Sequence, residues 1–252
     1  MGQLDGKSVI VCGAAQGIPQ AVAQLATREG ARVLALDINA EGLEETARLV
    51  AKEGGTPLTT VCDVTDRTQV DAAVELAASE HGTVDVLVNG AMNIVISPFE
   101  EQTAEDLQAV LDVNLFGPFH FMQACFPHMR EHGGRIINFA SGAGTGGSPT
   151  FGSYSAAKEG LRGLSKAAAK AWIGRGITVN CVIPQAATPG MVEVAEAMGE
   201  GGAEHLRLLH PMQRHGDPIT DIAPAVIFLA SEGAGYITGR SIFVDGGFAG
   251  FW

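Results

Sequence analysis

The sequence predicts an α/β protein, with helices on both faces of one doubly wound, seven-stranded parallel sheet. Two observations support this fold class: short runs rich in β-branched residues recur seven times, and stretches with apolar residues three and four positions apart separate them. Strands that alternate with helices are typical of a parallel sheet, because each parallel connection needs a crossover. With 252 residues, 46% of them hydrophobic, the chain can bury one sizeable core, so we expect a single domain over residues 1–252.

The expected strands are, in chain order, SVIVCG at 8–13, ARVLALD at 31–37, TTVCDV at 59–64, VDVLVNG at 84–90, GRIINFAS at 134–141, ITVNCVIP at 177–184 and SIFVDGG at 241–247. Between them, helices with one apolar face are expected, because apolar residues follow helical spacing at Ala21, Leu25, Leu43, Ala47, Val50, Val70, Val74 and Ala77. Residues 185–216, rich in Gly, Glu and His, interrupt the alternation after the sixth strand. A segment at that position is expected to be a lid over an active site.

The charge balance argues against two classes of partner. The chain has 28 acidic and 16 basic residues, a formal net charge of −12, so a nucleic-acid backbone or an anionic membrane surface would be repelled. No apolar run approaches a membrane span, and the N-terminus lacks the apolar stretch of a signal peptide. The four cysteines lie far apart, with no CxxC pair and no histidine cluster, so we expect core thiols, no metal site and a cytoplasmic protein.

Residues 12–21, CGAAQGIPQA, form a glycine-rich stretch between the first expected strand and the first expected helix. In that context backbone N–H groups can bind a pyrophosphate, so Gly13 and Gly17 predict a dinucleotide site, although such glycine spacings also occur in plain turns. Asp37 follows Gly17 by 20 residues and ends the second strand, where its carboxylate can accept both hydroxyls of an adenosine ribose. The same carboxylate would repel a 2′-phosphate, and its neighbours supply no cation, so NAD is expected in preference to NADP.

Pro19 stands where a third glycine is expected in that stretch. A proline in the first helical turn loses only an N–H that has no intrahelical partner, so the loop is expected to survive. The third glycine normally permits close packing of the helix against the strand. We therefore expect looser packing at Pro19 and weaker affinity for the cofactor.

Tyr154 and Lys158 lie four residues apart at the start of an expected helix, on one face. A lysine ammonium beside a phenol favours the phenolate, so the pair predicts a tyrosine with a lowered pKa that acts as acid and base. Ser141 follows the fifth strand at the carboxyl end of the sheet, where its hydroxyl can orient a substrate oxygen. The alternatives are structural: an amphipathic helix residue, a solvated charge and a helix cap.

In order along the chain, these motifs resemble those of the short-chain dehydrogenase/reductase family over essentially its whole length. CGAAQGIP is similar to the family's T-G-x-x-x-G-I-G loop, CDV at 62–64 to its adenine-pocket D-V pair, and VNGAM at 88–92 to its V-N-N-A-G. The set is completed by VNLFG with Asn114, FAS with Ser141, YSAAK with Tyr154 and Lys158, and YITGRSIFVDGG at 236–247. The resemblance implies a Rossmann-type fold and hydride transfer between a nicotinamide and a carbinol or carbonyl carbon.

The resemblance also implies roles for individual residues. Tyr154 would be the acid and base, Ser141 would hydrogen-bond the substrate oxygen, Lys158 would hold the nicotinamide ribose, and Asn114 would anchor a water linked to Lys158. The implied cofactor contacts are Gln16 and Ile18 at the phosphates and ribose, Asp63 and Val64 at the adenine, Asn89 at the adenosine ribose and Ala187 at the carboxamide. A homotetramer is implied as well, built through helices around 103–130 and 154–173 and the C-terminal strand.

Departures from the family pattern bear on the substrate. Gly90 stands where the family has asparagine, and Met92 and Gln185 stand where it has glycine, the latter two at the expected reacting end of the pocket. Met191 lies on an apolar face of the expected lid and few cations are nearby, so the expected substrates are a hydrophobic secondary alcohol and its ketone. Two alternatives stay open: reduction of a 3-oxoacyl thioester with NADPH, and a cofactor-sensing or scaffold protein with little turnover.

Overall fold

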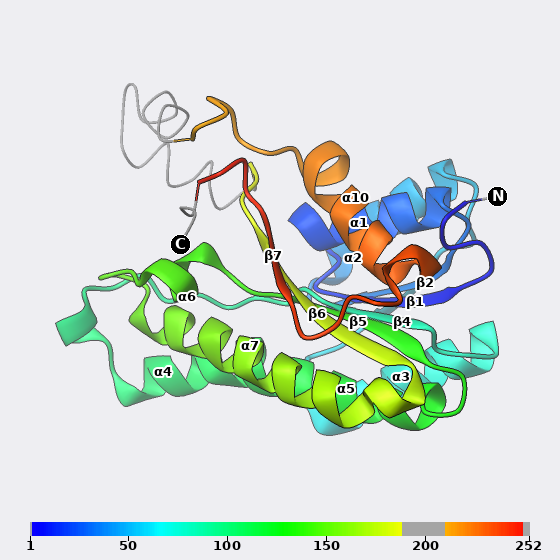
Figure 1. Cartoon of the computed structure of the whole chain (residues 1–252), viewed down its shortest axis with the longest axis horizontal. Coiled ribbons are helices and arrows are strands. Elements are labelled where there is room, and N and C mark those ends of the chain that lie inside the picture. The colour runs from blue at the N-terminus through cyan, green and yellow to red at the C-terminus, as the bar shows by residue number, and fades with distance from the viewer. Residues whose placement is uncertain (1, 188–209, 249–252) are drawn as a thin grey trace.

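Seven parallel strands form the middle layer of the computed structural model, which describes residues 2–187 and 210–248 (Figure 1). They lie across the sheet in the order β3-β2-β1-β4-β5-β6-β7, which confirms the predicted doubly wound topology. The strands are β1 (Ser8–Cys12), β2 (Arg32–Asp37), β3 (Leu58–Val61), β4 (Val86–Asn89), β5 (Gly134–Phe139), β6 (Ile177–Pro184) and β7 (Ser241–Val244). The strand order switches direction between β1 and β4, and sheets of this kind bind ligands at the carboxyl ends of the strands beside that switch.

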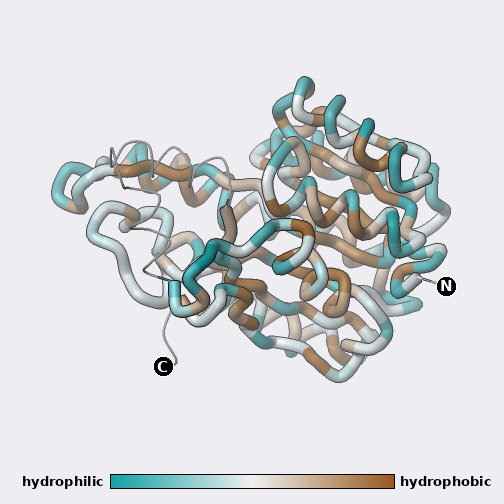
Figure 2. The backbone as a smooth tube through the Cα atoms, turned by 90° about the horizontal axis from the view of Figure 1, so that it is seen from above, coloured by the Kyte–Doolittle hydropathy of each residue, from teal (hydrophilic) through white to brown (hydrophobic). Residues whose placement is uncertain are grey.

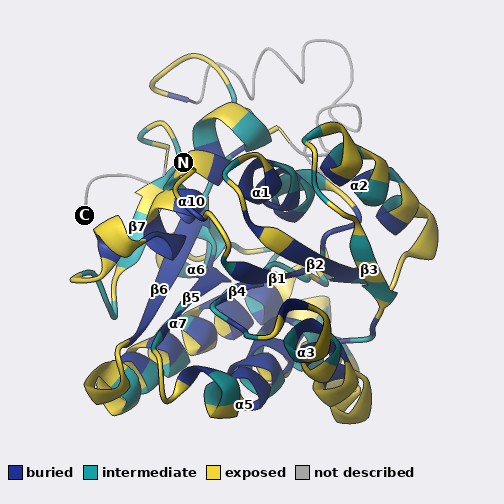
Figure 3. Cartoon of the chain, turned by 90° about the vertical axis from the view of Figure 1, so that its right-hand side faces the viewer, coloured by how far each residue is buried: buried dark blue, intermediate teal, exposed yellow. Residues whose placement is uncertain are grey.

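Helices cover both faces of the sheet, as predicted (Figure 1, Figure 3). One face carries α1 (Gly17–Arg28), α2 (Ala40–Lys52) and α10 (Ala223–Ala230). The opposite face carries α3 (Arg67–His81), α5 (Gly117–Met129) and α7 (Gly152–Trp172), with α4 (Ala104–Leu111) packed beside α7. The short α6 (Gly142–Gly146) lies between β5 and α7.

The central strands are buried on both faces, which explains why their sequences are continuous apolar runs rather than alternating ones. Every residue of β1 and β4 is buried, whereas the edge strands β3 and β7 are only partly covered. Figure 2 shows the result along the backbone, with hydrophobic segments running through the interior and hydrophilic segments in the outer turns.

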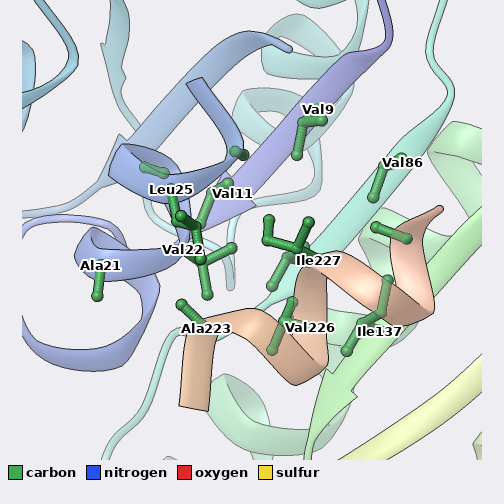
Figure 4. Packing of buried hydrophobic residues seen from close by; sticks show 14 of the residues in the cluster. Val9, Val11, Ala21, Val22, Leu25, Val86, Ile137, Ala223, Val226 and Ile227 are labelled. Carbon is green, nitrogen blue, oxygen red and sulfur yellow. The ribbon is translucent and has the colours of Figure 1, made fainter. Parts of the chain in front are cut away.

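Two hydrophobic clusters hold the helices on the sheet. On one face, α1 and α10 pack over β1, β4 and β5, where Val22, Leu25 and Ile227 belong to one buried cluster (Figure 4). On the other face, Phe121 of α5 and Ile136 of β5 are buried in the second cluster. Since full burial of a side chain of this kind contributes about 1.5–3 kcal/mol, the clusters fix the positions of the loops at the strand ends.

Polar side chains set where three helices begin. Asn39, two residues after β2 ends, caps α2, and Asp66 caps α3 with its carboxylate. Thr103 and Asp106 form a reciprocal capping box at the start of α4. Each cap satisfies backbone N–H groups that have no partner within the helix and stabilises its helix by about 1 kcal/mol.

Helix α4 continues into α5 through a π-helical turn at Asp112–Phe116. Asn114 lies in this turn with its side chain fully buried, and its Nδ2 donates to the carbonyl oxygens of Asn93 at 2.6 Å and Val110 at 2.9 Å. Turns of this type within α-helices are frequent at functional sites.

The two ends of the expected lid are described, at residues 185–187 and 210–216. They meet in a parallel bridge between Ala186 and Gly216, and the N–H of Ala187 donates to the Gly216 carbonyl oxygen at 2.8 Å. Met191 lies outside the described residues.

Within residues 2–187 and 210–248, no helix is long and apolar enough to cross a bilayer, and no three His, Cys, Asp or Glu side chains gather as a metal-binding group. Cys12, Cys62, Cys125 and Cys181 are buried free thiols.

Candidate active site

A cavity of about 570 Å³ lies at the carboxyl ends of the strands, between the loops that follow β1 to β6 and the start of α7. Most of the predicted site residues line it, namely Gly13, Gln16, Gly17, Ile18, Asp37, Asp63, Val64, Met92, Ser141, Tyr154, Lys158 and Gln185. The lining also includes residues to which the sequence analysis gave no role: Cys62, Ala91, Asn93, Val113, Phe139, Ala140, Pro184 and Ala186. Several of these are next to predicted residues in the sequence, as Ala140 is to Ser141, and this adjacency could have indicated them.

The two glycines of the first loop have different structural roles. Gly13 and Gly17 have φ values of 77° and 65°, in the left-handed region that favours glycine. A Cβ at Gly13 would lie 2.5 Å from the backbone nitrogen of Ala91, so the loop packs tightly against the end of β4. A Cβ at Gly17 would meet nothing within 4 Å, which leaves the start of α1 open to the cavity.

Pro19 and Gly90, both departures from the family pattern, lie against each other. Pro19 is buried in the first turn of α1, and a Cβ at Gly90 would lie 2.4 Å from Pro19 Cγ. The proline ring therefore occupies space that a side chain at position 90 would need. We expected looser packing of α1 at Pro19, but the glycine at position 90 accommodates the ring and keeps the helix close to the sheet.

Asp37 lies at the end of the cavity formed by β1, β2 and β3. Its Oδ2 accepts a hydrogen bond from the N–H of Ala15 at 3.0 Å, and its Oδ1 accepts one from the N–H of Asn39 at 2.9 Å. These bonds fix the carboxylate and leave each oxygen free to accept from a ribose hydroxyl. The neighbouring Ile38 is 68% exposed, and Lys158 is the one lysine or arginine among the described lining residues.

Tyr154, Lys158 and Ser141 meet at the other end of the cavity. Lys158 and Tyr154 lie one turn apart on α7, both buried, with Lys158 Nζ 5.5 Å from the centre of the Tyr154 ring. Lys158 Nζ donates to the carbonyl oxygen of Phe139 at 2.9 Å. Ser141 caps α6 and lies beside the Tyr154 phenol, whose pKa it lowers. The predicted catalytic group is thus assembled on the strand β5 side, across the cavity from Asp37.

The Tyr154 pKa differs from the expectation. Burial raises the pKa of Tyr154 to about 12, because the phenolate would lose its hydration, and the hydrogen bond from Ser141 offsets only part of this. Burial also lowers the pKa of Lys158 to about 8. The lowering predicted for Lys158 together with an oxidised nicotinamide does not appear in the chain alone, because the phenol is desolvated and Lys158 donates to the Phe139 carbonyl oxygen.

Three other predicted residues lie outside the lining. Asn114 is buried, and its Oδ1 has no hydrogen-bond partner among the described residues, which leaves an acceptor that suits a bound water. The Asn89 side chain turns into the sheet, where its Nδ2 donates to Asn138 Oδ1 at 2.8 Å. Ala187 is exposed at the base of the 185–216 segment.

Met92 contacts the phenol directly. The Tyr154 hydroxyl donates to Met92 Sδ at 3.3 Å, and the Met92 side chain is 60% exposed. The sequence predicted Met92 at the reacting end of the pocket on the basis of its position alone, and the contact agrees with that placement.

Gln102 joins the two connections that carry Met92 and Tyr154. Its Nε2 donates to the carbonyl oxygens of Ser97 at 2.9 Å and Thr150 at 3.2 Å, and its Oε1 accepts from the N–H of Ser153 at 2.9 Å. One amide side chain therefore ties the connection after β4 to the start of α7. The sequence contains no pattern that would have revealed this residue.

The cavity fits a dinucleotide. The open, left-handed Gly17 presents the backbone at the start of α1, where pyrophosphates bind. Asp37 retains acceptor capacity for ribose hydroxyls at one end, and Lys158 supplies a donor at the other. Pro19 removes one N–H from the first turn of α1 and leaves those of Gly17 and Ile18.

Known proteins resemble this chain over nearly its full length. A family model described as Enoyl-(Acyl carrier protein) reductase matches residues 13–249. The D-threitol dehydrogenase of Mycolicibacterium smegmatis is 39% identical over 248 residues, which cover 98% of this chain and 94% of that protein. The 3-oxoacyl-acyl-carrier-protein reductase FabG of Thermotoga maritima is 36% identical over 97% of this chain and 98% of its own length. A solved actinorhodin polyketide ketoreductase with NADPH superposes with a TM-score of 0.93 at 30% identity, covering 100% of both chains.

Proposed function

The chain belongs to the short-chain dehydrogenase/reductase family, and we propose that it is an NAD-dependent dehydrogenase that interconverts a hydrophobic secondary alcohol and its ketone. One observation carries the proposal: a single cavity has Asp37 at one end and Tyr154, Ser141 and Lys158 at the other. The family binds a nicotinamide cofactor. In this chain the adenosine half would lie by Asp37 and the reacting half by Tyr154.

The preference for NAD is supported by charge. Asp37 would accept hydrogen bonds from the two hydroxyls of an adenosine ribose and would repel a 2′-phosphate at the same position. Asp63, fixed by the N–H of Thr65 at 2.9 Å, adds a second carboxylate to this end of the cavity. Ile38 and Gln16, which border the same region, carry no positive charge that would bind the phosphate of NADP.

The proposed mechanism uses Tyr154 as the acid and base. A nicotinamide cofactor held between Asp37 and Lys158 would accept or supply the hydride. During oxidation, Tyr154 Oη accepts the hydroxyl proton of the alcohol while Ser141 hydrogen-bonds the same oxygen; during reduction, Tyr154 returns the proton. Lys158, protonated below its pKa of about 8, would donate from Nζ to the nicotinamide ribose. Asn114 Oδ1 would hold the water that connects Lys158 to solvent.

The substrate class is proposed from the side chains around Tyr154. Met92, Val113 and Pro184 give this end of the cavity apolar surface, which favours a hydrophobic alcohol. Asn93 and Gln185 add polar groups that would suit a polyol, the kind of substrate named for the relative from Mycolicibacterium smegmatis. Lys158 is the one lysine or arginine among the described lining residues, and it already has a role at the cofactor. No other cation there would hold a phosphorylated substrate.

A substrate panel tests the proposal. The protein is incubated with NAD and either 2-octanol, a hydroxysteroid or D-threitol, and NADH formation is followed by absorbance. Tyr154→Phe should lose at least about 100-fold in rate, because acid–base catalysis contributes about 10²–10⁴-fold. The matched control is Tyr236→Phe, which alters the second of the two tyrosines at a fully exposed position and should leave the rate unchanged. Full activity of Tyr154→Phe would contradict the mechanism.

A second candidate function is the reduction of a 3-oxoacyl thioester. It is favoured by the similarity to the Thermotoga maritima reductase and to the polyketide ketoreductase with NADPH. A higher rate with acetoacetyl-CoA and NADPH than with any alcohol and NAD would replace our proposal with this one. Tight NADH binding without turnover of any of these compounds would instead favour a cofactor-sensing or scaffold protein.

We also propose a cytoplasmic homotetramer. Leu107 and Phe116 on the α4–α5 segment and Phe243 on the edge strand β7 are exposed apolar side chains on the elements expected to form contacts between subunits. Analytical ultracentrifugation should give about four times the 26.1 kDa chain mass. A monomer across the micromolar range would rule this assembly out.

A further inference from the structure

We propose that Met92 is a modification site: a peroxide oxidises its thioether to a sulfoxide, which blocks the Tyr154 hydroxyl until the sulfoxide is reduced. The observation behind it is the hydrogen bond of 3.3 Å from Tyr154 Oη to Met92 Sδ. The inference rests on the proposed function, because it requires Tyr154 to be the acid and base of the reaction.

Met92 is accessible to an oxidant, unlike most other sulfur atoms near the site. Of the methionines within residues 2–187 and 210–248, Met122 and Met129 are buried, whereas Met92 and Met212 are 60% and 59% exposed. Met92 lines the cavity and Met212 does not. The cysteine thiols are buried, so a peroxide in solution would reach Met92 before them.

The oxidation step is balanced with hydrogen peroxide. A lone pair on Met92 Sδ forms the new S–O bond while the O–O bond of the peroxide breaks. The sulfur loses two electrons, the peroxide is reduced, and water leaves. A thiol-dependent methionine sulfoxide reductase reverses the change, with two thiols oxidised to a disulfide as the S–O bond is lost to water.

The product would compete with substrate for the phenol. A thioether sulfur is a weak acceptor, so a substrate oxygen can displace it from the Tyr154 hydroxyl. A sulfoxide oxygen is a polar, stronger acceptor that projects from the same sulfur, and the flexible methionine side chain can turn it toward Oη. The Tyr154 proton would then be held by the enzyme's own side chain where the substrate oxygen has to bind.

Met212→Leu provides a matched control for Met92→Leu, because the two methionines are equally exposed. Wild-type enzyme and both variants are treated with hydrogen peroxide, and peptide mass spectrometry measures the sulfoxide at each methionine. The rate of each protein on 2-octanol or D-threitol, whichever supports turnover, is compared with its own untreated rate. NADH binding, followed by fluorescence, reports whether the oxidised protein is still folded.

Wild type and Met212→Leu should lose about two- to tenfold in rate, the ratio that one competing hydrogen bond of ordinary strength would give. The loss should follow the fraction of Met92 sulfoxide, leave NADH binding in place, and be reversed by methionine sulfoxide reductase. Met92→Leu should keep most of its own untreated rate.

Two results would overturn the inference alone: equal inactivation of Met92→Leu and wild type, or an undiminished rate when Met92 is fully oxidised. An untreated enzyme that turns over none of the panel alcohols would overturn the proposed function and this inference together. The untreated controls therefore separate the two failures.

Discussion

The contact between Pro19 and Gly90 predicts that these two departures from the family pattern depend on each other. In Gly90→Ala, the new Cβ would lie 2.4 Å from Pro19 Cγ and 2.9 Å from the Cys12 carbonyl oxygen. Carbon atoms rest at about 3.5–4.0 Å from each other, so the alanine overpacks the site. Overpacking costs about 1–3 kcal/mol, and a mid-range value of about 2 kcal/mol would lower the Tm of a chain of this size by about 4–8 °C.

A double-mutant cycle measures this dependence. Wild type, Gly90→Ala, Pro19→Gly and the double variant are unfolded in urea, and the cycle cancels the backbone entropy that glycine adds at position 19. We expect the double variant to be more stable than the sum of the single effects, with partial rescue because the Cys12 oxygen remains close. Gly163→Ala is the control, since an added Cβ there meets nothing within 4 Å. Additive effects within about 0.5 kcal/mol would refute the reasoning.

Three further predictions follow from the charges of the site and core. Asp37→Ser combined with Ile38→Arg should shift the preference from NADH toward NADPH by roughly tenfold or more, measured as the ratio of the two dissociation constants, and an unchanged ratio would count against the role of Asp37. NADH affinity should fall as the pH rises above about 8, because Lys158 loses its charge there, and a fluorescence titration of Lys158→Met should show no such step. Burial lowers the pKa of His81 from its usual 6.5, so the unfolded chain binds more protons and stability falls as the pH drops below 6.5. The urea midpoint of His81→Gln should vary less with pH in that range than the wild-type midpoint.

The parts of the molecule that depend on local sequence could be predicted. The order of the strands across the sheet could not be predicted from individual residues. Buried runs such as 8–13 and 134–141, separated by segments with helical spacing, were enough to predict a parallel sheet. Asp37 and the pair Tyr154 and Lys158 were found because each has a defined place relative to a strand end or a helix start. Parallel strands bring those places to one edge of the sheet, and the cavity is found there.

What could not be predicted depends on contacts between segments that are distant in sequence. Nothing near Pro19 indicates that Gly90 leaves room for its ring, and nothing near Tyr154 indicates that burial outweighs Lys158. The π-helical turn at Asn114 could not be predicted for the same reason, because the Asn114 side chain donates to the carbonyl oxygen of Asn93 on another segment. Spacing along one helix carries no information about desolvation or about the partner of a buried amide.

Gln102 has a consequence for anyone who transplants loops among relatives of this protein to change what they act on. Its amide joins the connection after β4 to the start of α7 through hydrogen bonds with the backbone of Ser97, Thr150 and Ser153. Grafting the connection after β4 alone would remove Gln102, and a graft before α7 with a different backbone course would move its partners at Thr150 and Ser153. The connection after β4 and the residues around the start of α7 should therefore be exchanged together.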